Sequence, residues 1–205
     1  MEQSLYLIRH AESALNVTPH LVGGRSNEAH LTDEGVLQAT RLGEFLLNER
    51  IEPISVYSSP ARRTLETAHH TLDAMKLKMT IITDDPLQEL DQGEFVGLDR
   101  SAVYTSEVLQ EIAVKGKDFK APGGESMNEA GARMKDWADS LPVTNGVIFG
   151  FAHGVAIRCF ISTLENWTHA QTNESYLANT SITRLDRVNG AWHLTYFGKD
   201  PQPKQ

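Results

Sequence analysis

Residues 5–16 read LYLIRHAESALN, and they change character abruptly after the fourth residue. The apolar run 5–8 predicts a short strand that is buried on both faces of a sheet. Arg9 and His10 follow it directly. Two basic side chains at the end of a buried strand need a physical reason, and we look for it in the rest of the chain.

Size and charge narrow the class of protein. The chain has 205 residues, a formal net charge of −8 and one cysteine, Cys159. The length suits one core, so we expect a single domain over 1–205. The acidic balance argues against a nucleic-acid partner, because phosphate backbones are bound through basic surface. We expect no membrane span, no signal peptide and no disulfide, which makes the cytoplasm the simplest compartment.

Apolar runs alternate with helical patterns along the chain. This alternation predicts an α/β protein, a three-layer α/β/α sandwich with a mostly parallel central sheet and helices on both faces. The strands of that sheet are expected at residues 5–8, 54–59, 79–83 and 147–152. The helices are expected to begin near residues 32 and 60 and to cover residues 99–114, 126–140 and 155–164.

Short local signals mark several element ends. Thr32 is a fair N-cap, and Ser59 followed by Pro60 predicts another N-cap with proline at the first helical position. The pattern SMNE at 126–129 is a capping box. The Asn-Gly pair within 181–197 predicts a hairpin, which would add an antiparallel edge to the sheet.

Two of the predicted strands end in a histidine. The first is followed by Arg9 and His10, and the strand 147–152 is followed by His153 and Gly154. In open α/β sheets, ligands bind beyond the carboxyl ends of the strands. Either histidine alone could be structural, but together they favour a functional site at this edge of the sheet.

Two further segments add charged groups to this site. Arg62 and Arg63 lie in the first turn of the helix expected after residue 59, and Glu89 follows a strand near turn-forming glycines. Two histidines, arginines and one carboxylate suit phosphoryl transfer through a histidine nucleophile.

The ordered motifs resemble those of the histidine phosphatase superfamily, the phosphoglycerate mutase-like proteins. The family motif R-H-G-E-[TS]-x-x-N is matched at 9–16, with Ala11 in place of glycine. The motif S-P-L-x-R-A-x-x-T-A is matched at 59–68, in a register that selects Arg63 rather than Arg62.

Three more segments extend the resemblance over most of the chain. The family motif L-x-E-x-x-x-G-x-x-x-G is matched at 87–97, and the strand-end H-G is matched at 153–154. The segment PGGES at 122–126 also resembles a segment of the family. The departures from the family pattern, which remove no functional group, are Ala11, Ala61 and Thr64.

The resemblance implies a catalytic role for five residues. His10 is expected to attack phosphorus as a neutral imidazole, its tautomer fixed by a partner such as a backbone carbonyl. Arg9, Arg63 and an imidazolium at His153 are expected to bind the phosphoryl oxygens. Glu89 is expected to supply the proton of the leaving alkoxide.

Weaker phosphate or substrate contacts are expected from four other residues: Asn16, Gly154, Gly24 and Arg25. For the last two, a mobile surface loop is an equally good interpretation. Residues 99–125 are a candidate lid with a basic cluster at Lys115, Lys117 and Lys120, although a solvated loop is the simpler interpretation of the cluster. No metal or cofactor is expected.

The leading hypothesis is a metal-independent phosphatase acting on a small phosphorylated metabolite. The alternative is a phosphoglycerate mutase. The chain is rather short for the extra segments associated with those mutases, so the phosphatase is preferred. A metallohydrolase with His10, His153 and Glu89 as ligands is disfavoured by the adjacent arginine. A non-catalytic phosphate-binding module is disfavoured by the complete set of reactive groups. The expected partner is a small phosphorylated substrate, and a homodimer is compatible with the sequence.

Overall fold

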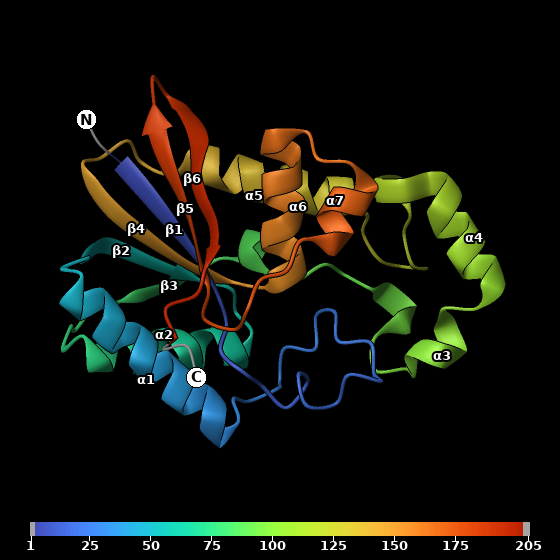
Figure 1. Ribbon diagram of the computed structural model, residues 1–205, viewed down its shortest axis with the longest axis horizontal. Coiled ribbons are helices and arrows are strands. Elements are labelled where there is room, and N and C mark those ends of the chain that lie inside the picture. Colours follow the sequence, from blue (N-terminus) through green and yellow to red (C-terminus); the bar gives the residue numbers. More distant parts are fainter. Residues whose placement is uncertain (1–2, 203–205) are drawn as a thin grey trace.

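The computed structural model describes residues 3–202, which form a six-stranded sheet between helical layers (Figure 1). The strand order is β3-β2-β4-β1-β5-β6. The first four strands of this order are parallel, and β5 and β6 form an antiparallel hairpin at one edge. The strands are β1 (Gln3–Arg9), β2 (Pro53–Ser58), β3 (Ile81–Thr83), β4 (Gly146–Ala152), β5 (Ile182–Val188) and β6 (Ala191–Lys199).

Helices cover both faces of the sheet, which confirms the predicted three-layer α/β/α architecture. One face carries α1 (Asp33–Asn48) and α2 (Arg62–Ala74), and the other carries α5 (Met127–Ser140) and α6 (Gly154–Glu165). Three shorter helices lie beyond α6 on the right of Figure 1: α3 (Arg100–Val103), α4 (Ser106–Lys115) and α7 (His169–Glu174). Single 3₁₀ turns cover Asp85–Leu87, Gly93–Phe95 and Gly116–Asp118.

The central strand β1 holds the two layers together, because its side chains alternate between two apolar clusters. Leu5 and Leu7 pack with α5 and α6, whereas Tyr6 and Ile8 pack with α1 and α2. All four are nearly or fully buried. The expectation of a strand buried on both faces is therefore confirmed.

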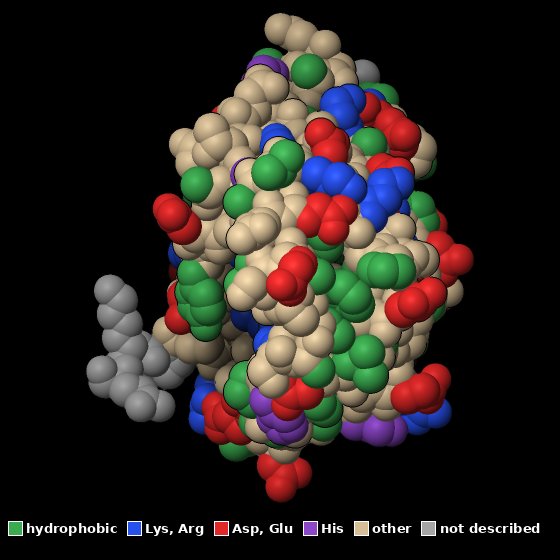
Figure 2. All heavy atoms as spheres, turned by 90° about the vertical axis from the view of Figure 1, so that its right-hand side faces the viewer, with side chains coloured by type: hydrophobic (Ala, Val, Ile, Leu, Met, Phe, Trp, Pro, Cys, Tyr) green, Lys and Arg blue, Asp and Glu red, His purple; other side chains and the backbone are tan. Residues whose placement is uncertain are grey.

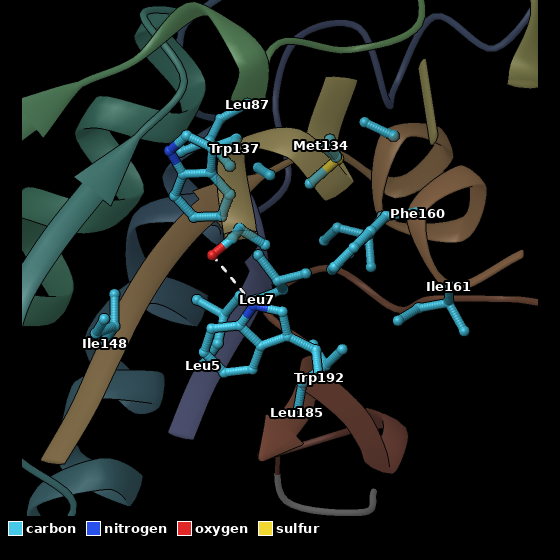
Figure 3. Packing of buried hydrophobic residues seen from close by; sticks show 14 of the residues in the cluster. Leu5, Leu7, Leu87, Met134, Trp137, Ile148, Phe160, Ile161, Leu185 and Trp192 are labelled. Atoms are coloured by element: carbon cyan, nitrogen blue, oxygen red, sulfur yellow. Dashed lines mark hydrogen bonds between the residues drawn. The ribbon is translucent and has the colours of Figure 1, made fainter. Parts of the chain in front are cut away.

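Two tryptophans close the α5–α6 side of this core. Trp137 and Trp192 lie against the side chains of β1, and the Trp192 indole N–H donates to the Ala138 carbonyl at 3.1 Å (Figure 3). This bond ties the edge strand β6 to α5 across the core. A buried indole needs such a partner, since an unpaired N–H in an apolar core is costly.

The closing hairpin follows the prediction. Asn189 and Gly190 both have positive φ, 51° and 86°, as a two-residue hairpin turn requires. The capping box at Ser126 and Glu129 and the Thr32 N-cap are also present.

Two boundary predictions are wrong, and one helix was not foreseen. The helix expected over 99–114 is split into α3 and α4, because Thr105 caps a new helix by accepting from Val108 N. Helix α2 begins at Arg62, since Ser59 N still donates to Phe151 O at 2.9 Å and keeps the chain beside β4. The unforeseen helix is α7, which begins with a capping box at Thr168.

The strand register sets the place of the site. Arg9 pairs with Ala152 across β1 and β4, and Phe151 pairs with Ser58 across β4 and β2. The residues that follow these pairs therefore leave the sheet together at its carboxyl edge. None of the helices in the described part of the chain is long and apolar enough to span a bilayer.

Phe160 on α6 is fully buried in the cluster that contains Leu5 and Leu7. We expect Phe160→Ala to lower the free energy of unfolding by about 3–5 kcal/mol, because it leaves a cavity in a close-packed core. Urea denaturation followed by circular dichroism measures this loss. Val114→Ala, at a side chain 87% exposed on α4, is the control and should stay within about 0.5 kcal/mol. A Phe160→Ala loss no larger than that of the control would contradict this packing.

Candidate active site

His10 and His153 lie against each other at the carboxyl edge of the sheet. Their ring centroids are 5.2 Å apart in an edge-to-face arrangement, and both side chains are buried. His10 Nδ1 lies 2.7 Å from the Ala11 carbonyl, which can only accept, so this nitrogen carries the proton. A neutral His10 therefore has its lone pair on Nε2. The expected backbone carbonyl partner is present.

Arg63 reaches the same nitrogen from the first turn of α2. Its Nε donates to His10 Nε2 at 3.3 Å, and its two terminal nitrogens donate to the carbonyls of Ser26 and Gly24. Arg63 as a whole residue is 2% exposed. The loop 23–26 thus fixes Arg63 beside the unprotonated face of His10.

Arg9 approaches from the end of β1 on the other side. One terminal nitrogen donates to the Leu177 carbonyl, whereas its buried Nε has no partner among residues 3–202. A Cβ built on Gly154 would lie 3.2 Å from that Nε, so only glycine fits comfortably at the start of α6. The strand-end glycine therefore gives Arg9 room beside the helix N-terminus.

The surroundings favour neutral rings at both histidines. Burial, then the charges of Arg63 and Arg9, lower the pKa of His10 well below its ordinary value of 6.5. Burial, then Arg63 and His10, lower the pKa of His153 in the same direction. The imidazolium expected at His153 is therefore disfavoured by the protein's own groups. Burial lowers the pKa of Arg63 to about 10, which leaves it protonated at neutral pH.

Ser59 and His153 form a buried contact that the sequence did not reveal. Ser59 Oγ lies 2.9 Å from His153 Nε2 and also accepts from Ala61 N at 3.3 Å. The hydroxyl hydrogen can therefore be donated to Nε2, which places the ring proton on Nδ1. Within the described chain, His153 Nδ1 is buried without a hydrogen-bond partner.

The Glu89 carboxylate lies at the N-terminus of α6. It accepts from the backbone N–H groups of Ala156 at 2.8 Å and Val155 at 3.2 Å, and also from Leu90 at 2.8 Å. An acidic group is stabilised there by the helix dipole and the unpaired N–H groups. Three donors from two segments fix the carboxylate beside Arg9.

The side chains of Arg9, His10, Arg63 and Glu89 line one cavity of about 440 Å³, whereas His153 is fully buried against His10 and is not among the wall residues. Its walls include most of the residues singled out in the sequence: Arg9, His10, Asn16, Gly24, Arg63 and Glu89. Asn16 Oδ1 accepts from Ser13 and Asn179, which leaves its amide N–H groups for other partners. Gly154 lines an adjoining hollow of about 270 Å³ together with Arg9 and Glu89.

The cavity is cationic although the protein is acidic. Arg9, Arg63 and Arg100 line it, and Glu89 is the only acid among its wall residues. Such a pocket suits a small anion with several oxygens, because guanidinium groups offer paired donors. Over residues 3–202, no three His, Cys, Asp or Glu side chains are grouped as metal ligands.

The family is decided by a match along nearly the whole chain. The model of the histidine phosphatase superfamily (branch 1) matches residues 5–200. The chain belongs to this superfamily. Its members are enzymes that act on small phosphorylated substrates, which agrees with the cationic cavity.

Related proteins carry both kinds of activity in their names. A protein called probable phosphoglycerate mutase GpmB from Proteus mirabilis (strain HI4320) is 32% identical over 193 residues, 92% of this chain and 86% of the relative. Two solved structures share the fold. Mycobacterial glucosyl-3-phosphoglycerate phosphatase Rv2419c has a TM-score of 0.82 and 22% sequence identity, and the match covers 97% of this chain and 100% of that chain. Bacillus stearothermophilus YhfR has a TM-score of 0.84 and 23% sequence identity, and the match covers 96% of this chain and 97% of that chain.

Arg25 differs from the sequence expectation. Arg25 is not among the wall residues of the cationic cavity. Its guanidinium donates to the Glu89 carbonyl at 3.2 Å and pairs with Asp91 and Glu125. Gly24, in contrast, lines the cavity with φ of +48°, where a Cβ would lie 2.9 Å from Val96. The loop 23–26 is thus held on both sides rather than free.

Arg133 and Glu125 are functional candidates that sequence reasoning missed. Arg133 donates to the Glu89 carbonyl at 3.1 Å, and the Glu125 carboxylate binds both Arg133 and Arg25. Two arginines bridged by one carboxylate therefore hold the backbone of Glu89. The only sequence signal was the position of Glu125 in the segment PGGES.

The predicted basic cluster does not face the cavity. Lys115 pairs with Glu111, Lys117 donates to Trp167 O at 2.7 Å and Ser162 Oγ at 3.2 Å, and Lys120 pairs with Glu129. Local partners take up all three ammonium groups. Arg62, which the motif register does not select, pairs with Glu28.

We expect the pKa of His10 to lie below 6.5 and to rise in Arg63→Met, because removing the guanidinium relieves its repulsion of the imidazolium. Long-range ¹H–¹⁵N spectra of ¹⁵N-histidine-labelled protein, recorded against pH and assigned with His10→Asn, measure this value. Arg62→Met is the matched control, since Arg62 is exposed and paired with Glu28. A His10 pKa that is equal in the wild type and in both variants would contradict this electrostatic arrangement.

Proposed function

We propose that the protein is a metal-independent phosphomonoester hydrolase that forms a phosphohistidine on His10. The observation that carries the proposal is the hydrogen bond from His10 Nδ1 to Ala11 O, which leaves Nε2 as the unprotonated nitrogen beside Arg63. A buried, neutral and oriented imidazole is a competent nucleophile. The arginine-lined cavity supplies the place for the phosphoryl group.

In the first step, His10 Nε2 attacks phosphorus, and the P–O bond to the alcohol breaks. We propose that Glu89 becomes protonated when the anionic phosphate ester is bound beside it, and that it donates this proton to the departing alkoxide, so that a neutral alcohol leaves. In the second step a water molecule attacks the phosphohistidine and Glu89 takes one of its protons. The P–N bond breaks, and inorganic phosphate and neutral His10 are regenerated.

The transferring group spreads negative charge over three oxygens, and the site offers donors for them. Arg9 Nε and His153 Nδ1 are both buried and lack a partner in the described residues, so a phosphoryl oxygen would satisfy each. Arg63 and the amide of Asn16 complete the proposed set, with the Gly154 N–H at the start of α6.

A phosphoglycerate mutase is the second candidate, because relatives such as the Proteus mirabilis protein carry that name. A mutase that returns the phosphoryl group must hold the carboxylate or second phosphate of its substrate. The lysines that could do so if their segment covered the cavity, Lys115, Lys117 and Lys120, are bound to local partners. This observation supports hydrolysis over transfer of the phosphoryl group to another position of the substrate.

The products decide between the two candidates. With 4-nitrophenyl phosphate and with 3-phosphoglycerate, we expect one inorganic phosphate released for each ester consumed, because water is the final acceptor. Phosphate release and ³¹P NMR of the glycerate products measure this. Conversion of 3- to 2-phosphoglycerate without phosphate release would make the protein a mutase instead.

The matched control is His10→Asn. It should abolish both turnover and the acid-labile, base-stable phosphate trapped on the wild-type protein by rapid quenching. Labelling that persists in this variant would show that another residue is the nucleophile.

Glu125→Gln tests the proposed acid through its support. Loss of the carboxylate loosens Arg25 and Arg133 from Glu89, so we expect kcat for an alkyl phosphate to fall about 10- to 100-fold. 4-Nitrophenyl phosphate should be affected much less, because its leaving group needs no proton. Steady-state kinetics on both esters measure this difference. The control Glu111→Gln removes an exposed carboxylate paired with Lys115, and equal losses on both esters in Glu125→Gln would oppose the role of Glu89 as acid.

A further inference from the structure

The end of the molecule that carries α3 and α4 faces the viewer in Figure 2, and hydrophobic, acidic and basic side chains are interspersed over it. On the described part of this face no one kind of side chain gathers, so the surface does not select a class of partner. The hydrogen bonds around the cationic cavity lead instead to an inner segment, residues 177–181, between α7 and β5.

Residues 177–181, which we call the crossing segment, run over the end of β1 and hold its last residue. Arg9 N donates to Ser181 O, and Thr180 N donates to Arg9 O, both at 3.1 Å. The Arg9 guanidinium donates to Leu177 O in the same segment. The crossing segment therefore binds the backbone and the side chain of Arg9 together.

Thr180 turns the crossing segment out of the line of β5. Its φ is +59°, in the left-handed region that a β-branched residue rarely adopts, so other contacts must hold it there. The residue is fully buried, and its Oγ1 donates to Asn179 O at 2.6 Å and accepts from Gln202 Nε2 at 2.8 Å. This fixed turn brings the side chain of Asn179 to the backbone of His10.

The Asn179 amide reaches two oxygens of the site. Nδ2 donates to His10 O at 2.9 Å and lies 3.4 Å from Asn16 Oδ1. An amide NH₂ has two hydrogens, so one group can serve both oxygens. Asn16 lines the cationic cavity, whereas Asn179 is not among its wall residues. Any influence of Asn179 on a bound anion therefore passes through the residues that it holds.

The Asn16 amide can be turned in two ways, and its neighbours select one of them. Oδ1 accepts from Ser13 N at 2.9 Å and from Ser13 Oγ at 3.1 Å, with Asn179 Nδ2 as the third donor. The Ser13 hydroxyl can donate or accept, but the Ser13 N–H and the Asn179 NH₂ can only donate. These two donors keep Oδ1 on their side and leave the Asn16 NH₂ for the cavity. The reversed amide would present an oxygen to the anion and repel it.

We propose that Asn179 is a positioning residue for phosphoryl transfer, which orients the Asn16 amide so that its N–H groups face the phosphoryl group. The inference rests on the proposed function and adds a residue that does not contact the substrate. The His10 carbonyl can only accept, so it fixes the Asn179 amide, which in turn fixes that of Asn16. Because these contacts begin at the residue that carries the proposed nucleophile, nucleophile and amide donor keep one relative position.

A double-mutant cycle on Asn16 and Asn179 tests the proposal with 4-nitrophenyl phosphate, whose leaving group needs no proton from Glu89. We expect Asn179→Ala to lower kcat/KM about ten-fold or more, because an Asn16 amide that is free to turn no longer holds its donors at the phosphoryl group. Added to Asn16→Ala, the same change should lower kcat/KM by no more than about three-fold, since the two residues act as one unit.

The matched control is Asn128→Ala. It removes an exposed amide that donates to Asp118 Oδ1 at 2.6 Å, and Asn128 is not among the wall residues of the cavity. This variant should keep the kcat/KM of the wild type. Where circular dichroism shows Asn179→Ala to be unfolded, Asn179→Ser takes its place in the cycle, because its shorter side chain keeps a polar group in the turn and does not extend to Asn16.

A second measurement observes the Asn16 amide directly. ¹H–¹⁵N spectra of ¹⁵N-asparagine-labelled protein contain its side-chain signals, which Asn16→Ala assigns. Orthovanadate, which mimics the transferring phosphoryl group, should shift these signals in the wild type and in Asn128→Ala. Most of the shift should be absent in Asn179→Ala.

The outcomes separate this proposal from the hydrolase function. Losses that multiply in the double variant, or a loss in Asn179→Ala no larger than in Asn128→Ala, overturn the positioning role and leave the hydrolase function standing. So does an Asn16 signal that ignores orthovanadate in the wild type or shifts equally in Asn179→Ala. Phosphate release from none of the esters overturns the hydrolase function, and the orthovanadate shift then decides the positioning role alone.

Discussion

The site depends on the hydrogen bond between His10 Nδ1 and the Ala11 carbonyl. A carbonyl cannot donate, so this one contact fixes which nitrogen holds the proton and how the ring is turned. It is stable because the backbone at Ala11 is itself held, with its N–H donating to Thr67 Oγ1 on α2 at 3.0 Å. The ring of His10, the proposed nucleophile, is therefore oriented by the packing of β1 against α2 and does not need a substrate to orient it.

The cationic groups around that ring are held by backbone carbonyls rather than by carboxylates. Leu177, Ser26 and Gly24 supply oxygens to Arg9 and Arg63. Carbonyls satisfy the donors without neutralising their charge, so the positive potential remains directed at the cavity. The same loop sends Arg25 to the Glu89 carbonyl, so one short segment, 23–26, positions both the arginine at His10 and the proposed acid.

The sequence predicted those parts of the site that belong to strand ends and helix starts. His10 and His153 had to meet, because parallel neighbouring strands end at the same edge and the register pairs Arg9 with Ala152. Arg133 and the contact of Ser59 with His153 could not be foreseen, since they join segments about 44 and 94 residues apart in the chain without a local pattern. Arg25 was misplaced for the same reason: its partners come from other loops.

The chemistry that a phosphatase and a mutase have in common explains why sequence similarity leaves the activity open. In the proposed mechanism His10, Arg9 and Arg63 act on the phosphoryl group, and either enzyme would need them equally. What separates the two is the fate of the phosphohistidine and the alcohol that is bound beside it. The three lysines of the 99–125 segment are bound to Glu111, Trp167 and Glu129. Under the proposed function these ammonium groups therefore offer a second anion no additional contact, which favours hydrolysis over return of the phosphoryl group.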